Sequence, residues 1–219
     1  MVRAQGSDRT VCLGKLEVFH ELDSGIWNLG SGMRYSIHML ERIDVYVLLK
    51  LVAMHEAGHW VQSGLAHEIG VSPSVVNRCL KQAEELKLYN PSRKQVNVQA
   101  LEDALVHGAR YFLAPKKGGE VRGMPTAWAA PPLVDEIVSS EALPPVWPDP
   151  MGEFRGLSVE PLHPSAPQAA GRDRKFYELL ALVDVLRLGG PREKALAVKE
   201  LHRRFVLKGE SEQENFANN

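Results

Sequence analysis

Length, composition and charge limit what this chain can be. It has 219 residues, of which 44% are hydrophobic and 24% are charged, a balance that favours one or two small globular domains over a disordered tail. Because the formal net charge is -1, the molecule as a whole does not attract phosphates, and any affinity for nucleic acid has to come from a local basic patch.

The N-terminal residues 1–38 show no sustained helical or strand period. We therefore expect an N-terminal extension of unknown role. Met33 and Met39 stand just before the first periodic segment, so an alternative is that translation starts at one of them and the preceding residues are not part of the protein.

Residues 39–113 carry the strongest periodicity, and we expect one domain there. Apolar residues at helical spacing predict a first helix over residues 43–58, with the glycine at its end as a stop signal. A short strand is predicted at residues 60–61. A second helix follows over residues 63–69, with Ser63 as its N-cap.

A turn, a third helix and a β-hairpin are expected next. Gly70 permits a tight turn, and Pro73 suits the first position of a helix that the apolar spacing extends to about residue 88. Short strands at residues 88–89 and 96–98 flank a turn-rich, basic segment. This arrangement is typical of a two-stranded wing.

Beyond the wing the composition changes twice. Residues 98–113 are predicted to form another helix, whose apolar positions include Leu101, Leu105 and Tyr111. Residues 114–171 are rich in glycine and proline, so we expect an extended or irregular connection between two units. Apolar spacing over residues 172–208, interrupted by Gly-Gly-Pro, predicts a C-terminal helical hairpin that could serve dimerisation, and a polar tail at residues 209–219.

The segment 62–81 has the residue pattern of a helix-turn-helix. Ala66 is small where two helices must cross closely, and Gly70 permits the positive backbone angle of the turn. The apolar side chains that close the angle between the two helices are Leu65, Ile69, Val71, Val76 and Cys79. Over residues 43–112 the chain resembles the winged helix-turn-helix of MarR-type transcriptional regulators.

This resemblance implies a mainly α fold with a small β-wing and a function as a sequence-specific regulator that binds double-stranded DNA. It also implies a homodimer with dimerisation helices outside the winged domain, for which the helix after the wing and the C-terminal hairpin are candidates. The proline-rich connection and the late hairpin depart from the compact layout of the family.

In such a unit the N-terminal part of the second helix faces base edges in the major groove. Asparagine and arginine can make bidentate contacts to adenine and guanine, whereas serine and lysine suit phosphates. The DNA-binding candidates are Ser72, Ser74, Asn77, Arg78, Lys81 and Gln82 in the helix at 73–88, and Arg93 and Lys94 in the wing.

Two alternatives remain open. The first is a protein-interaction module on the same fold, such as an antitoxin that binds a toxin-like partner and regulates its own synthesis. The second is a zinc metallopeptidase, because His55-Glu56-Ala57-Gly58-His59 matches the pattern in which two histidines hold zinc and a glutamate activates water. His67 does not stand at the spacing that a third histidine ligand would have. We therefore favour a protein without enzymatic activity, metal or cofactor.

The basic, glycine-rich segment 116–123 is not a phosphate-binding loop, since it lacks the Gly-Lys-Ser/Thr ending. We expect an ordinary exposed loop there, and a contact with DNA or a partner protein stays open.

Cysteine usage and hydropathy bear on the compartment. Cys12 and Cys79 are too few and too far apart for a disulfide framework. No apolar run approaches the roughly 18 residues that span a bilayer, and the N-terminus lacks a signal-peptide pattern. We expect a cytoplasmic protein with no membrane partner.

Overall fold

The computed structural model of the chain describes residues 20–22, 26–28, 34–36, 39–54, 60–137 and 143–217. The chain divides into two compact units, Met1–Met39 and Leu40–Asn219. In the first unit, an antiparallel sheet is formed by β1 (His20–Leu22), β2 (Ile26–Asn28) and β3 (Arg34–Ser36). The sequence period did not predict these three short strands.

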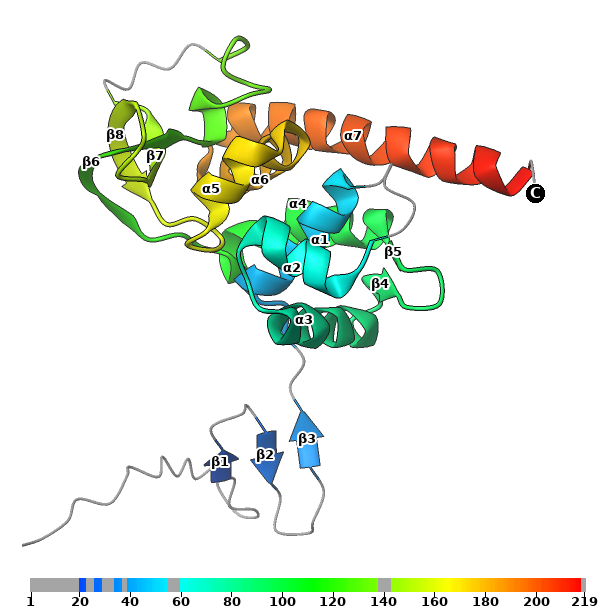
Figure 1. The fold of residues 1–219 in the computed structure, drawn as a ribbon. Coiled ribbons are helices and arrows are strands. Elements are labelled where there is room, and N and C mark those ends of the chain that lie inside the picture. Colours follow the sequence, from blue (N-terminus) through cyan, green and yellow to red (C-terminus); the bar gives the residue numbers. More distant parts are fainter. Residues whose placement is uncertain are drawn as a thin grey trace, which may run out of the picture. The chain divides into compact units, whose positions relative to one another are not determined.

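The second unit is mainly helical (Figure 1). Its helices are α1 (Arg42–Ala53), α2 (Gln62–Ile69), α3 (Pro73–Glu85), α4 (Val98–Phe112), α5 (Ala166–Arg172), α6 (Arg174–Leu188), α7 (Pro191–Ala217) and the 3-10 turn η1 (Ala127–Ala129). Its strands are β4 (Tyr89–Asn90), β5 (Gln95–Val96), β6 (Lys117–Pro125), β7 (Pro145–Pro148) and β8 (Phe154–Val159). The expected mainly α class with little β structure is confirmed. None of the helices in the described ranges is both long enough and apolar enough to cross a membrane.

α1 begins with a capping box and ends earlier than expected. The carboxylate of Asp44 accepts the backbone N–H of Glu41 at 2.9 Å, and the Glu41 side chain accepts the N–H of Asp44 in return. The last helical residue is Ala53, with Met54 as the C-cap. The predicted stop at Gly58 is therefore too late, because apolar spacing does not report where the backbone leaves the helix.

The N-cap of α2 lies two residues earlier than the sequence suggested. Trp60 and Val61 belong to no strand, and Val61 is instead the extended N-cap of a helix that starts at Gln62. Because Leu65 N donates to Val61 O at 3.0 Å, the first helical turn is already closed before Ser63 could cap it. The predicted strand and the predicted N-cap are both wrong.

The turn between α2 and α3 has the predicted backbone. Gly70 has a φ of 69°, in the left-handed region that glycine enters without steric cost. A Cβ at Gly70 would lie 3.0 Å from the Cβ of Ser165, so the turn also packs closely against the chain before α5. Pro73 is the first residue of α3, as expected, and Ser72, which was expected in the turn, is its N-cap.

The predicted hairpin is present, with shorter strands than expected. α3 ends at Glu85, because Lys87 adopts a left-handed φ of 61° and turns the chain into β4. β4 and β5 pair antiparallel around the turn 91–94. Asn97 does not extend β5 but caps α4, where its Oδ1 accepts the N–H of Ala100 at 3.2 Å.

α4 closely matches the predicted helix over residues 98–113, but not all of its predicted apolar face is covered. Leu101 and Leu105 are buried. Tyr111 is 75% exposed, and its ring centroid lies 5.6 Å from the guanidinium of Arg110. The interpretation of Tyr111 as a packing residue within this chain is therefore wrong.

The described parts of the segment 114–171, residues 114–137 and 143–171, are not an extended connection. β6 pairs antiparallel with β7 and β8, and β7 pairs parallel with β8, so the three strands close on themselves. Such a close approach needs glycine, since a Cβ on Gly123 would lie 2.0 Å from Trp147 O and one on Gly156 would lie 2.1 Å from Pro144 O. The glycines that suggested a linker instead allow a tight sheet.

α6 lies at the centre of the second unit and contacts α1, α4, α5, α7 and η1. Its residues 179–187 are all buried, so it is covered on every side rather than on one face. A single buried cluster joins Leu48 of α1, Leu105 of α4 and Leu182 of α6. The expectation of two units separated by a linker is therefore wrong, because the predicted hairpin shares its core with α1–α4.

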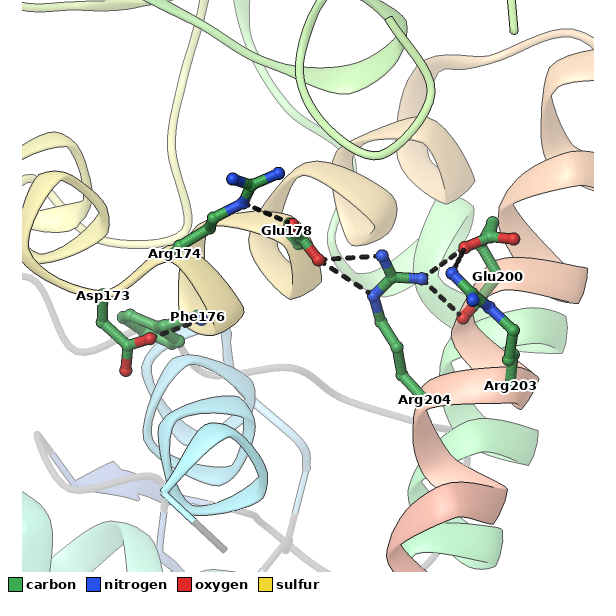
Figure 2. Close-up of polar contacts among 7 residues, drawn as sticks. All are labelled: Asp173, Arg174, Phe176, Glu178, Glu200, Arg203 and Arg204. Carbon is green, nitrogen blue, oxygen red and sulfur yellow. Dashed lines mark hydrogen bonds and ion pairs between the residues drawn. The ribbon is translucent and has the colours of Figure 1, made fainter. Parts of the chain in front are cut away.

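The predicted C-terminal hairpin of α6 and α7 is present, with Gly189 and Gly190 between the helices. An ion pair connects the two helices (Figure 2): Arg204 Nη2 of α7 lies 2.8 Å from Glu178 Oε2 of α6. Arg204 also pairs with Glu200 in its own helix. Burial alone would raise the pKa of Glu200. The guanidinium groups of Arg204 and Arg203 outweigh burial and hold this pKa below its usual value.

α7 continues to Ala217, where a polar tail was expected at residues 209–219. The segment after Gly209 is rich in glutamate and glutamine and contains no proline. Helix propensity therefore does not oppose continuation of the helix through this polar sequence.

Candidate nucleic-acid interface

The predicted contact residues of α3 lie on its outer side. Its inner side packs into the core through Val76, Cys79, Leu80 and Ala83. The exposed members of the predicted set are Ser72, Ser74, Asn77, Arg78 and Lys81, while Gln82 is half-buried. The first turn carries no acidic residue, and the acidic residues Glu84 and Glu85 stand at the other end. The N-terminal part of α3 therefore presents a polar and basic surface together with the positive end of the helix dipole.

The two serines have different roles in this geometry. Ser72 Oγ accepts the N–H of Val75 at 3.4 Å, which makes Ser72 the cap of the helix. Its hydroxyl lies 2.8 Å from that of Ser74. Ser72 thus fixes where α3 begins, and Ser74 is the first exposed side chain that can reach outward.

Arg78 points toward the start of α1, where its Nη1 lies 3.4 Å from Glu41 Oε2. Both side chains are exposed, so the pair contributes little stability and a phosphate or base can replace it. Close to this pair, burial raises the pKa of Asp44. Burial also raises the pKa of the Cys79 thiol, and together with the neighbouring Asp44 side chain it brings this pKa to about 12. Cys79 therefore stays protonated and is a packing residue.

The hairpin holds the two remaining predicted cations at its tip. Arg93 and Lys94 are exposed. Asn90 Oδ1 accepts the N–H of Arg93 at 3.2 Å, and Lys94 N donates to Pro91 O at 3.3 Å with a left-handed φ of 52° at Lys94. These bonds order the turn that carries both cations.

A groove of about 440 Å³ lies between α3, the start of α2 and the hairpin. It is lined by Trp60, Val61, Gln62, Asn77, Leu80, Lys81, Glu84, Tyr89, Pro91 and Lys94. It thus brings together Asn77, Lys81 and Lys94 of the predicted set, and among the described residues that line it Glu84 is the only acidic one. Sequence reasoning missed Trp60 and Gln62, because it placed a strand where the chain enters α2.

The turn that positions α3 accepts hydrogen bonds from two side chains that the sequence did not single out. Tyr46 OH donates to Ile69 O at 3.2 Å, and Ser165 Oγ donates to the same carbonyl at 2.5 Å. The ring of His163 stacks on that of Tyr46 with centroids 5.3 Å apart, and burial lowers the pKa of His163. No sequence motif indicates such contacts, because they join segments about a hundred residues apart in the chain.

A buried polar network in the second unit is structural. Asp184 Oδ2 accepts hydrogen bonds from Thr126 Oγ1 at 2.7 Å and from Trp147 Nε1 at 2.6 Å, while Asp184 Oδ1 pairs with Arg187. Arg187 Nε also donates to Leu113 O at 2.6 Å. Since these side chains satisfy one another and the backbone, they tie β7 and the end of α4 to α6 and leave no group free for chemistry.

The His55-Glu56-x-x-His59 motif lies outside the described residues, so the metallopeptidase alternative stays a prediction. Within the described ranges, no cluster of three or more His, Cys, Asp or Glu side chains is arranged to hold a metal ion. α1, which would have to continue through the motif, ends at Ala53.

Comparisons with protein families, with curated proteins and with solved structures find no significant match to this chain. The similarity to MarR-type regulators therefore rests on the residue pattern of the segment 43–112.

Proposed function

We propose that this chain is a cytoplasmic transcriptional regulator that binds double-stranded DNA in a sequence-specific manner. In this proposal α2 and α3 are a helix-turn-helix and β4–β5 is the wing. One observation carries it: the outer face of α3 is polar and basic along its N-terminal part and lies across a groove from the hairpin cation Lys94. A helix with such a face fits the major groove, while a basic hairpin reaches the adjacent backbone.

Each contact residue has a distinct chemical role in the proposal. Asn77 and Arg78 suit bidentate contacts with adenine and guanine edges. Lys81 and Lys94, on the two sides of the groove, suit phosphates. Local charge has to supply the attraction, since the net charge of the chain is -1.

The proposal includes a homodimer that reads two half-sites. Exposed apolar side chains on α4 and α7, Tyr111 and Val206, support a contact between copies. Binding sequences would then be near-palindromic, with half-sites about 10 base pairs apart or a multiple of that spacing.

The test is a selection from random DNA duplexes at a stated salt concentration, followed by fluorescence anisotropy on the enriched sequence. We expect a near-palindromic sequence to be enriched. Replacing both Arg78 and Lys81 with alanine should weaken binding at least about tenfold, because each base or phosphate contact contributes roughly 1–3 kcal/mol. Lys81→Ala alone should reduce the salt dependence by about one released ion.

Lys199→Ala is the matched control, since this exposed lysine lies on α7, away from α3 and the hairpin in sequence. It should leave the affinity unchanged. Failure to enrich any sequence would contradict DNA recognition itself. Full binding by the Arg78/Lys81 variant would instead contradict the assignment of α3.

A further inference from the structure

Two arginines face the same direction at neighbouring positions of the small sheet. In the antiparallel pairing of β6 with β8, Arg122 stands directly opposite Arg155. Side chains directly opposite each other lie on one face of a sheet with Cβ atoms about 5 Å apart, and like charges there repel. Both side chains are exposed, that of Arg155 to 78%. The isolated chain therefore holds an unfavourable pair at this position.

The neighbouring pair in the register completes the face. Glu120 stands opposite Leu157, and residues two apart along a strand share a face. The face therefore consists of Glu120, Arg122, Arg155 and Leu157, which we call the Arg122 face. Arg155 Nη1 lies 3.4 Å from Glu120 Oε1. The only carboxylate of this face thus pairs with Arg155, and Arg122 has no side-chain partner among the described residues.

The sheet cannot relieve the repulsion by separating its strands. β6, β7 and β8 close on themselves, and the backbone approaches so closely at Gly123 and Gly156 that no side chain fits there. The backbone positions of Arg122 and Arg155 are consequently held at a fixed spacing. Two guanidinium groups that project from neighbouring positions on one face can bind the same carboxylate or phosphate group.

We propose that the Arg122 face binds an acidic segment of a partner protein. The carboxylates of that segment lie on Arg122 and Arg155, and an apolar side chain between them covers Leu157, which is 43% exposed. Leu157 favours a protein over a single-stranded nucleic acid, because an aliphatic side chain gives no stacking surface to unpaired bases. This site is formed by strands other than those of the proposed DNA-binding unit, so the inference does not rest on DNA binding.

The segment 116–123 was expected to be an exposed loop. This prediction is wrong, because residues 117–123 belong to β6. Its basic and glycine-rich character has a structural explanation in two parts. Gly123 allows strand closure, and Arg122 supplies half of the arginine pair.

The test uses the full chain and a fluorescein-labelled synthetic peptide with a repeated Glu-Glu-Leu-Glu sequence, measured by anisotropy at low salt. We expect saturable binding. Arg122→Gln and Arg155→Gln should each weaken it about tenfold, because each removes a charge-assisted hydrogen-bond pair. Glu120→Gln should strengthen binding by removing the competing carboxylate. The exposed Arg192 on α7 provides the matched control, and Arg192→Gln should bind as the unmodified chain does.

Unfolding by urea checks the variants independently. Because the arginine pair repels, Arg122→Gln should unfold at the same or a higher urea concentration than the unmodified chain. A lower midpoint would contradict the repulsion argument. The proposal is overturned if the peptide does not bind, if Arg122→Gln binds it normally, or if labelled oligothymidylate binds this face more tightly than the peptide does.

Discussion

Lys50 of α1 brings a charge into the interior of the second unit. Its side chain is only 6% exposed, with Nζ 2.7 Å from Glu68 Oε2 and 2.8 Å from Asp173 Oδ2. Lys50→Met should destabilise the fold by about 2 kcal/mol at neutral pH, less than for a fully buried pair because Glu68 remains partly in water. Urea unfolding measures this, with Lys199→Met on the exposed side of α7 as the control that should change little.

The ion pair of Lys50 with Asp173 predicts that the stability of the fold depends on pH. Burial alone would raise the pKa of Asp173, but the Lys50 ammonium and the N–H of Phe176 outweigh it and lower the pKa below the ordinary 3.8. Such a carboxyl stabilises the fold above its unfolded pKa, and this contribution is lost as the pH falls through the folded value. The difference between Lys50→Met and the unmodified chain should therefore shrink below pH 3.8. A constant difference would show that lost packing, not charge, is the cause.

Single residues with a local backbone role were predictable from the sequence. Gly70 and Pro73 define a turn and a helix start through conformations that their own chemistry favours. Lys50 and Ser165 were not, because their partners are distant in the sequence and no periodic pattern relates the two ends of such a contact.

At the scale of elements, the β6–β7–β8 sheet depends on glycines at specific positions. Gly123→Ala should destabilise it by about 3 kcal/mol or prevent folding, because the new Cβ would lie 2.0 Å from Trp147 O and backbone atoms cannot yield. Gly119→Ala in the same strand is the matched control, since no atom lies within 4 Å of a Cβ there. Thermal unfolding monitored by circular dichroism compares the two. Equal midpoints would contradict the described closure of the strands.

Helices were easier to predict than strands in this chain. The spacing of α3 and α4 is visible in the sequence because each of these helices buries apolar residues on one face and so shows a period. The strands of the small sheet carry glycine and proline, which are residues typical of loops. Composition alone therefore suggested a linker where close backbone packing requires those residues.

The candidate interface was predictable only in part for the same reason. Its α3 residues follow from one helical period. The groove, in contrast, combines α3 with Trp60 before α2 and Tyr89 in the hairpin. Such a surface depends on how the elements pack against one another, and the sequence patterns did not predict this packing.

At the scale of the whole unit, the proposed DNA-binding part and the C-terminal helices share one core. Leu182 of α6 is fully buried in the cluster that contains α1 and α4 residues. Leu182→Ala should cost about 3 kcal/mol, and amide hydrogen exchange in α1 and α4 should accelerate together with that in α6, because a shared core opens as one unit. Met151→Ala, at an exposed position, should leave all three helices unchanged. If exchange accelerated in α6 alone, the helices would form separate folding units, and the α1–α4 segment would fold without the C-terminal hairpin.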